Sequence, residues 1–156
     1  MGLDMYLYKK EYIGAEHKHN IDPSKQNIFI INDEEFPIEN LSYIIYRVGY
    51  WRKANAIHNF FVNECQDGRD DCKECYVPIH ILNKLYKICI EIHLIYKHQS
   101  NTKEGIKRVN ELLPPKEGFF FGSDEINDDY FDDIQHTITI LEPLLNNDCI
   151  YYQSSW

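Results

Sequence analysis

The chain has 156 residues, a length typical of a single domain, and its 44% hydrophobic residues are too many for a disordered protein. The formal net charge is −9, from 25 acidic against 16 basic residues, so most of the surface would repel the phosphate backbone of a nucleic acid. We therefore expect one domain over residues 1–156 that does not bind DNA directly.

The first strand is predicted at the N-terminus, over residues 3–8. Apolar residues alternate there with polar or aromatic ones, which is the period-two pattern of a half-buried strand. Leu3, Met5 and Leu7 would face the core. Residues 9–22 carry several charges and a glycine, and they predict a loop or an irregular hairpin connection.

Two short apolar segments and a change of period follow. Residues 28–31 predict a short strand, whereas residues 42–48 fit a strand or a helix by periodicity alone. From residue 50 to residue 65, apolar side chains recur every three or four positions, which predicts a helix. Its core-facing side would consist of Trp51, Ala54, Ile57, His58, Phe61, Val62 and Cys65.

Three more helices are predicted in the second half of the chain. The longest begins near Pro78 and runs to about residue 98 along a continuous apolar stripe. Another covers residues 103–113 and is stopped by Pro114. Asn127 can cap the last helix, whose first turn holds acidic residues that favour the positive end of the helix.

Two further strands complete the predicted fold. The aromatic run at residues 118–122 lies between two glycines and predicts a short buried strand. Residues 150–156 predict a strand at the C-terminus. Together these elements predict an α+β fold, in which a small and mostly antiparallel sheet packs against three or four helices.

A polar strip without acids lies on the predicted helix at residues 50–65. It contains Arg52, Asn55 and Asn59, and His58 lies beside it within the apolar face. Because arginine and amide groups donate hydrogen bonds in several directions, these four residues are the predicted site for a phosphate, a carboxylate or a base edge. In the alternative interpretation, His58 is a core residue bonded to a backbone carbonyl and the strip is only solvated.

Acidic residues gather around the start of the last predicted helix. Carboxylates four residues apart on a helix repel one another by roughly a few tenths of a kcal/mol, and a basic partner would relieve that repulsion. The predicted partner-binding residues are Asp124, Asp128, Asp129, Asp132 and Asp133. Alternatively, these residues form a solvated helix face that only keeps the protein soluble. Their spacing does not match an EF-hand loop.

The cysteines bear on metal binding and on the cellular compartment. The candidate metal ligands are Cys65, Cys72, Cys75, His58 and His80. They include one C-x-x-C pair but lack the second, so we predict no bound metal and no cofactor. Five cysteines cannot all pair within the chain, the N-terminus lacks a signal-peptide pattern, and no apolar segment approaches the ~20 residues of a membrane span. We therefore expect a cytoplasmic protein without membrane attachment.

Several short segments, spread over the whole chain, carry a resemblance to a known group. They are MGLDMYLYKK at residues 1–10, WRKANAIHNFFV at 51–62, DC at 71–72, LLP at 112–114, GFFFGS at 118–123 and YYQSSW at 151–156. Together they resemble a family of small proteins encoded by bacteriophages and prophages. The resemblance implies a phage origin, and thus a location in the host bacterial cell, and it carries over no catalytic residues.

A phage origin favours an accessory protein that acts by binding. We expect it to inhibit a host antiviral defence system, either as an anti-CRISPR-like binder of a defence protein or by sequestering a nucleotide signal. Its partner would then be a host defence protein or a nucleotide-like small molecule. The alternative is a small enzyme that acts on a nucleotide or nucleic acid, with His58 as general acid or base.

Overall fold

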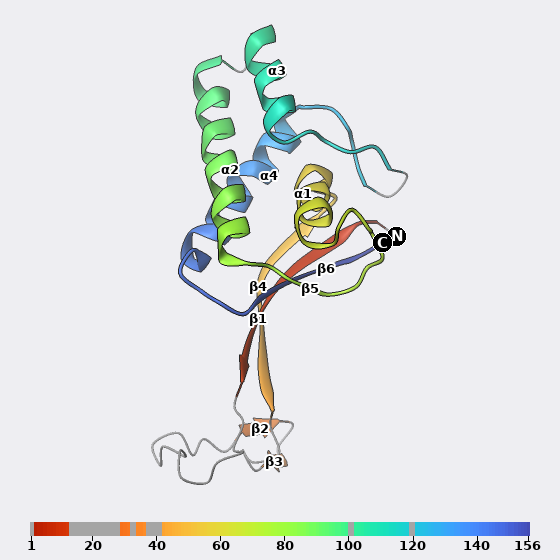
Figure 1. Ribbon diagram of the computed structural model, residues 1–156, viewed down its shortest axis with the longest axis vertical. Helices are drawn as coiled ribbons and strands as arrows, with labels where there is room; N and C mark the ends of the chain where they lie inside the picture. Colours follow the sequence, from red (N-terminus) through yellow and green to blue (C-terminus); the bar gives the residue numbers. More distant parts are fainter. Residues whose placement is uncertain (1, 13–28, 32–33, 37–41, 100–101, 119–120) are drawn as a thin grey trace.

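An antiparallel sheet with helices on one side organises the fold (Figure 1). The computed structural model describes residues 2–12, 29–31, 34–36, 42–99, 102–118 and 121–156. Within these residues four strands pair in the order β4-β1-β6-β5, which confirms the predicted α+β fold. The strands are β1 (Asp4–Tyr12), β4 (Tyr43–Arg52), β5 (Cys75–Tyr76) and β6 (Ile150–Ser155).

The helices and the inner face of the sheet share one hydrophobic core. The helices are α1 (Asn55–Cys65), α2 (Ile79–Gln99), α3 (Lys103–Leu112) and α4 (Asp128–Leu141), followed by a 3-10 turn at Glu142–Leu144. A separate small hairpin pairs β2 (Phe29–Ile31) with β3 (Glu34–Phe36). No helix in the described part of the chain is long and apolar enough to cross a membrane.

Strand β1 has the inward and outward faces that its sequence predicts. Leu3, Met5 and Leu7 are fully buried, and the strand pairs with β4 on one side and β6 on the other. The strand is longer than expected, because pairing with β4 continues to Tyr12. The predicted loop is therefore wrong for residues 9–12, and the rest of that loop lies outside the described residues.

The predicted helix at residues 50–65 begins too early. Pairing with β1 carries strand β4 through Arg52, and α1 begins only at Asn55. Trp51 is buried because of the two-residue alternation of a strand, although the same position also fits a helical face. Lys53 adopts a left-handed backbone conformation, with φ of 61°, where the chain turns from strand to helix.

The ambiguous segment at residues 42–48 belongs to β4 from Tyr43 onward. A β-bulge at Val48 interrupts the pairing with β1. At the next residue, a Cβ on Gly49 would come within 2.8 Å of Ile140 Cγ2, so only a glycine lets β4 pass this close to α4.

The three helices predicted for the second half of the chain are confirmed. Helix α2 buries its apolar stripe, and its first turn is closed by hydrogen bonds to the Pro78 carbonyl. Helix α3 covers the predicted residues to within one position. Asn127 caps α4, since its Oδ1 accepts a hydrogen bond from the Tyr130 N–H at 3.2 Å.

The aromatic run at residues 118–122 is not a strand in its described part. Gly118, Phe121 and Gly122 lie in no strand, and the Phe121 N–H bonds back to the Gly118 carbonyl at 3.0 Å. The φ of 91° at Gly122 is also incompatible with an extended backbone. Phe121 nevertheless is buried, with its ring edge-on to His58 at a centroid distance of 5.0 Å.

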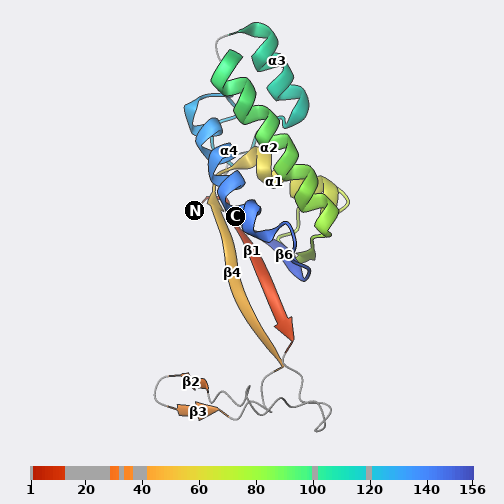
Figure 2. The same ribbon diagram turned by 90° about the vertical axis from the view of Figure 1, so that its left-hand side faces the viewer.

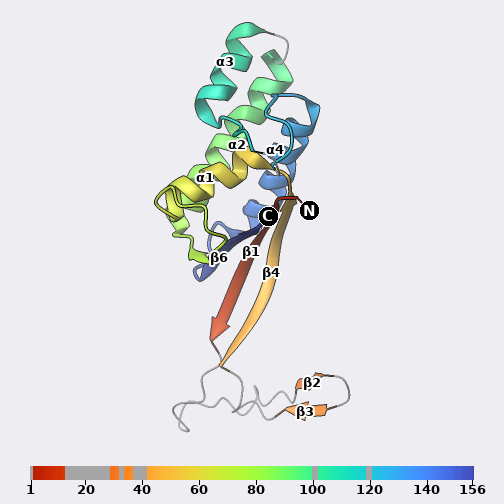
Figure 3. The same cartoon turned by 90° about the vertical axis from the view of Figure 1, so that its right-hand side faces the viewer.

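Strands β1 and β4 extend beyond the rest of the sheet, away from the helices (Figures 2 and 3). Strand β6 pairs with β1 only from Asp4 to Lys9, whereas β4 pairs with β1 as far as Tyr12. Among the described strands, the outermost part of the sheet thus consists of two strands only. We call this part the β1–β4 arm and define it as residues 10–12 and 43–45.

Candidate functional site

The four residues of the predicted ligand site do not form one strip. Arg52 ends strand β4 and is exposed, whereas Asn55 and His58 are buried on α1. Asn59 lies half-buried on the same helix and accepts a hydrogen bond from Asn63 Nδ2 at 3.3 Å. The structure therefore assigns different environments to these residues, because α1 begins after Arg52.

Asn55 holds a neighbouring segment of the chain in place. Its Nδ2 donates to the carbonyls of Phe121 and Ser123 at 3.2 and 2.6 Å, and its Oδ1 accepts from the Lys116 N–H at 3.1 Å. The side chain is only 4% exposed. Since both amide hydrogens are in use, Asn55 has a structural role and offers no free donor to a ligand.

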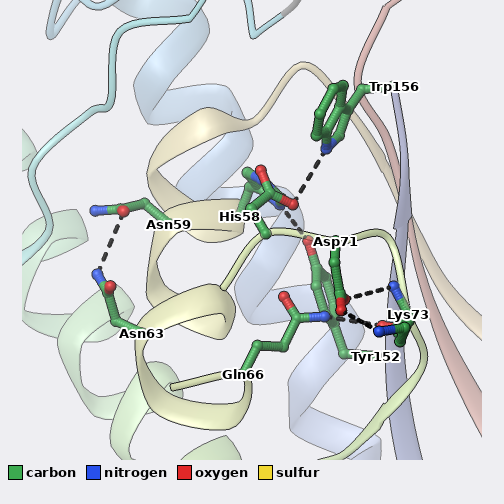
Figure 4. Close-up of polar contacts among 9 residues, drawn as sticks. His58, Asn59, Asn63, Gln66, Asp71, Lys73, Tyr152 and Trp156 are labelled. Atoms are coloured by element: carbon green, nitrogen blue, oxygen red, sulfur yellow. Dashed lines mark hydrogen bonds and ion pairs between the residues drawn. The ribbon is translucent and has the colours of Figure 1, made fainter. Parts of the chain in front are cut away.

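His58 lies in a buried chain of hydrogen bonds (Figure 4). Its Nε2 is 2.8 Å from Asp70 Oδ2, and its Nδ1 is 2.6 Å from the Tyr152 hydroxyl. Trp156 Nε1 donates to the other Asp70 oxygen at 3.1 Å. An ionised carboxylate can only accept, so Nε2 carries the hydrogen and Nδ1 accepts from Tyr152. The alternative interpretation expected His58 to bond to a backbone carbonyl. Its two ring nitrogens bond to the side chains of Tyr152 and Asp70 instead.

The order hydroxyl, imidazole and carboxylate is also found in hydrolytic triads, but here the hydroxyl is closed off from solvent. The side chains of Tyr152 and His58 are both fully buried. Burial lowers the pKa of His58, and the bond to Asp70 opposes this effect in part. A neutral ring with both nitrogens engaged joins α1 to the 66–73 loop and to β6.

A pocket of about 460 Å³ lies between the start of α1 and the first turns of α4. This pocket brings Arg52 and Asn55 of the predicted ligand site next to Asp129, Asp132 and Asp133 of the predicted partner site. The charged residues that line it are Arg52, Lys53, Glu125, Asp129, Asp132 and Asp133. His58 and Asn59 do not line it. The first turn of α1, which has no capping side chain, also borders this pocket.

The acidic residues of the predicted partner site differ in their exposure. Asp124, Asp128, Asp129 and Asp132 are exposed, as expected, and only Asp133 is half-buried. Burial raises the pKa of Asp133 to about 6, against the influence of His136 and with a contribution from its acidic neighbours. Asp133 thus departs from the predicted solvated face.

Two of the candidate metal ligands, Cys65 and Cys75, lie together, and Cys72 is not part of this pair. The Cys65 and Cys75 thiols form a hydrogen bond, which together with burial raises the pKa of Cys65. No group of three or more possible metal-ligating side chains occurs among the residues that the structure describes. The absence of bound metal remains a prediction.

A row of tyrosines lines the sheet on the side away from the helices. These residues, which we call the tyrosine face, are Tyr6, Tyr8, Tyr50, Tyr76 and Tyr151. The Tyr6 ring lies 5.9 Å from Tyr8 and 5.5 Å from Tyr50, and the Tyr76 and Tyr151 rings are 5.7 Å apart. Tyr50 and Tyr76 are 39% and 48% exposed.

Sequence reasoning missed the tyrosine face. The alternation in β1 puts Tyr6 and Tyr8 on its outer side, but the partners of these two residues depend on the register with β4 and β6. The period of the sequence predicts a helix at Tyr50, whereas the structure places this residue in β4. Since a face is built across strands, only the pairing brings the rings together.

Comparisons with protein-family models, with curated proteins and with solved structures found no match to this chain.

Proposed function

We propose that the chain is a phage-encoded binding protein that inhibits a host antiviral defence by docking on a defence protein through the tyrosine face. The observation that carries this proposal is the open, tyrosine-lined side of the sheet. The phage origin rests on the resemblance of several sequence segments. In this proposal the protein acts by occupying its partner and catalyses no reaction.

Tyrosine suits such a docking surface for two physical reasons. Each ring has a large apolar area and a hydroxyl that can bond to a partner or to water. It also has few rotatable bonds, so little conformational entropy is lost when a partner fixes it. Tyr50 and Tyr76 lie on strands at the two sides of the four-stranded sheet, so a partner could contact both ends of the face.

The charges on this side of the sheet indicate the chemistry of the partner. Among the outward positions of β1 and β4, the side chain of Arg47 is exposed and takes part in no hydrogen bond or ion pair within the described residues. Lys10 is paired with Glu74, and Asp4 accepts a hydrogen bond from Tyr50. A complementary partner surface would therefore present carboxylates and aliphatic side chains.

The position of His58 does not support the alternative function, in which the protein is a small enzyme with His58 as general acid or base. A general acid or base must reach the substrate directly or through one water molecule. His58 is fully buried, and the residues that line the 460 Å³ pocket do not include it.

We expect the double variant Tyr50→Ala, Tyr76→Ala to lose its anti-defence activity while staying folded. Truncating a tyrosine that anchors an interface costs about 2 kcal/mol or more, so the loss should exceed about tenfold. The chain is expressed in bacterial strains that each carry one defence system, and the plaquing efficiency of a sensitive phage is measured.

Tyr96→Ala is the matched control for this experiment. Tyr96 is 37% exposed but lies on α2, where its ring stacks on Phe131. This variant should retain full activity. If wild-type protein restores plaquing in no strain, or if the double variant restores it fully, docking through the tyrosine face is refuted.

A second candidate function is supported by the pocket between α1 and α4. Arg52, Lys53 and the uncapped first turn of α1 could hold the phosphate of a nucleotide. Asp129 and Asp132 could accept hydrogen bonds from the exocyclic amino group of its base. In this version the protein would sequester a nucleotide signal.

For this second candidate, we expect Arg52→Ala to weaken nucleotide binding by about tenfold or more, because a charge-assisted hydrogen bond is lost. Isothermal titration with nucleoside triphosphates and cyclic dinucleotides measures the effect. Arg69→Ala is the control, since Arg69 is exposed and does not line the pocket. Equal affinities of the two variants, or no binding by the wild type, would eliminate this candidate.

A further inference from the structure

Strand β4 forms a long, open edge of the sheet. The strand order places β4 at one edge and the two-residue strand β5 at the other. Along Tyr43–Arg52, no described strand pairs with the outer side of β4. An edge strand carries a row of backbone donors and acceptors that can pair with another chain.

Native proteins protect such edges with prolines, lysines or short strands, and β4 has few of these features. It contains no proline and no lysine, and a single bulge lies near its middle. Tyr43 and Ile45 are each 56% exposed, and Tyr46 is 43% exposed. Tyr46 is on the other side of the strand from Tyr43 and Ile45, so both sides of the edge present apolar area.

At the outer end of this edge, the sheet of described strands is only two strands wide. In the β1–β4 arm, the Tyr12 and Tyr43 rings lie 5.1 Å apart with their planes tilted by 56°, and no third strand among the described residues pairs with the arm. A hairpin of two strands is marginally stable in water, whereas four paired strands with apolar sides are stable. A further pair of strands would thus stabilise the arm as well as cover the edge.

We propose that β4 pairs antiparallel with β4 of a second copy of this chain. The pairing would place the strands in the order β1-β4-β4-β1 across a two-fold axis, so that each arm supplies the strands that the other lacks. The edge is self-complementary, because Arg47 is the only charged residue between Tyr43 and Trp51. Any antiparallel register that pairs Arg47 with neither Arg47 nor Arg52 of the other copy sets an apolar or uncharged residue opposite it.

The shape of the molecule permits this contact despite the net charge of −9. The arm extends away from the helices, so two copies joined at their arms hold the acidic first turns of their α4 helices apart (Figure 2). Repulsion between charges separated by more than about 8 Å is largely screened at physiological salt. The tyrosine face is not used in this pairing, and the dimer would present two such faces.

Light scattering after size exclusion should give the wild type twice the 18.6 kDa of one chain at micromolar concentration. Ile44→Lys should raise the dimer dissociation constant by at least about tenfold, because a lysine enters the edge of both copies. Ile44 lies opposite Glu11 on β1, so the new lysine gains an intramolecular partner and the fold is retained. Tyr43→Lys, at the neighbouring and exposed edge position, should also raise the dimer dissociation constant.

Leu94→Lys is the control, since Leu94 is 51% exposed on α2, and it should stay dimeric. A monomeric wild type would overturn the proposal, and so would a folded Ile44→Lys that dimerises as well as the wild type. If Tyr50→Ala, Tyr76→Ala abolishes the dimer instead, the copies meet through the tyrosine face and the edge pairing is wrong. Because Ile44→Lys leaves the tyrosine face intact, its plaquing activity tests the proposed function separately from dimerisation.

Discussion

Replacing Leu7 with aspartate is expected to lower the free energy of unfolding by about 4 kcal/mol or more. Leu7 is fully buried in β1, the strand that pairs with neighbours on both sides. It lies opposite Gly49 on one neighbour and Tyr152 on the other. An aspartate at this position would have no partner for its charge, and the hydrophobic core packed around it prevents it from reaching water.

The neighbouring substitution Tyr8→Asp is the control for this prediction. Tyr8 is half-buried on the outer side of β1, opposite Arg47, which would face the new carboxylate. Tyr8→Asp should lower the free energy of unfolding by only about 1 kcal/mol. Urea unfolding followed by circular dichroism gives both values. Equal losses in the two variants would contradict the inward orientation of Leu7.

Elements with a strong period over many residues could be predicted from the sequence. The alternation of β1 and the apolar stripes of α2 and α4 repeat often enough to fix both the element and its buried side. The boundary between β4 and α1 could not be predicted, because Trp51 fits the buried side of a strand and of a helix equally well. Pairing with β1, which lies far away in the sequence, decides this boundary.

The candidate sites depend more on tertiary contacts than the fold does. The period of α1 correctly placed His58 in the core, but nothing local identifies Asp70 and Tyr152 as its partners. Asn55 has the composition of a ligand-binding residue, and only the path of the 116–123 segment reveals its structural role. A lone amide or imidazole in a helix is consistent with either role until its neighbours are known.

His58→Ala is expected to lower the free energy of unfolding by about 2–4 kcal/mol at neutral pH. The variant removes the acceptor of the Tyr152 hydroxyl and one donor to Asp70, and it leaves a cavity beside Phe121. His80→Ala is the control, since His80 is exposed and should tolerate the change. Thermal and urea unfolding at pH 7 measure both effects.

The contribution of His58 to stability should also depend on pH. Burial lowers its pKa below the ordinary value of 6.5, so the unfolded chain binds a proton more readily than the folded one. The contribution is therefore fully present above pH 6.5 and is lost as the pH falls below it, at a rate of at most about 1.4 kcal/mol per pH unit. Asp133 acts in the opposite direction, because its raised pKa of about 6 lets the folded protein take up a proton first.

Comparing pH profiles of unfolding for the wild type and His58→Ala separates these two groups, since the variant keeps Asp133. The stability difference between the two proteins should be largest above pH 6.5 and should shrink as the pH is lowered toward 5. If the stability of His80→Ala varies with pH in parallel with that of the wild type, the pH effect belongs to the buried ring of His58. If the difference between wild type and His58→Ala stays constant from pH 8 to pH 5, His58 does not gain a proton on unfolding and is not held neutral between Tyr152 and Asp70.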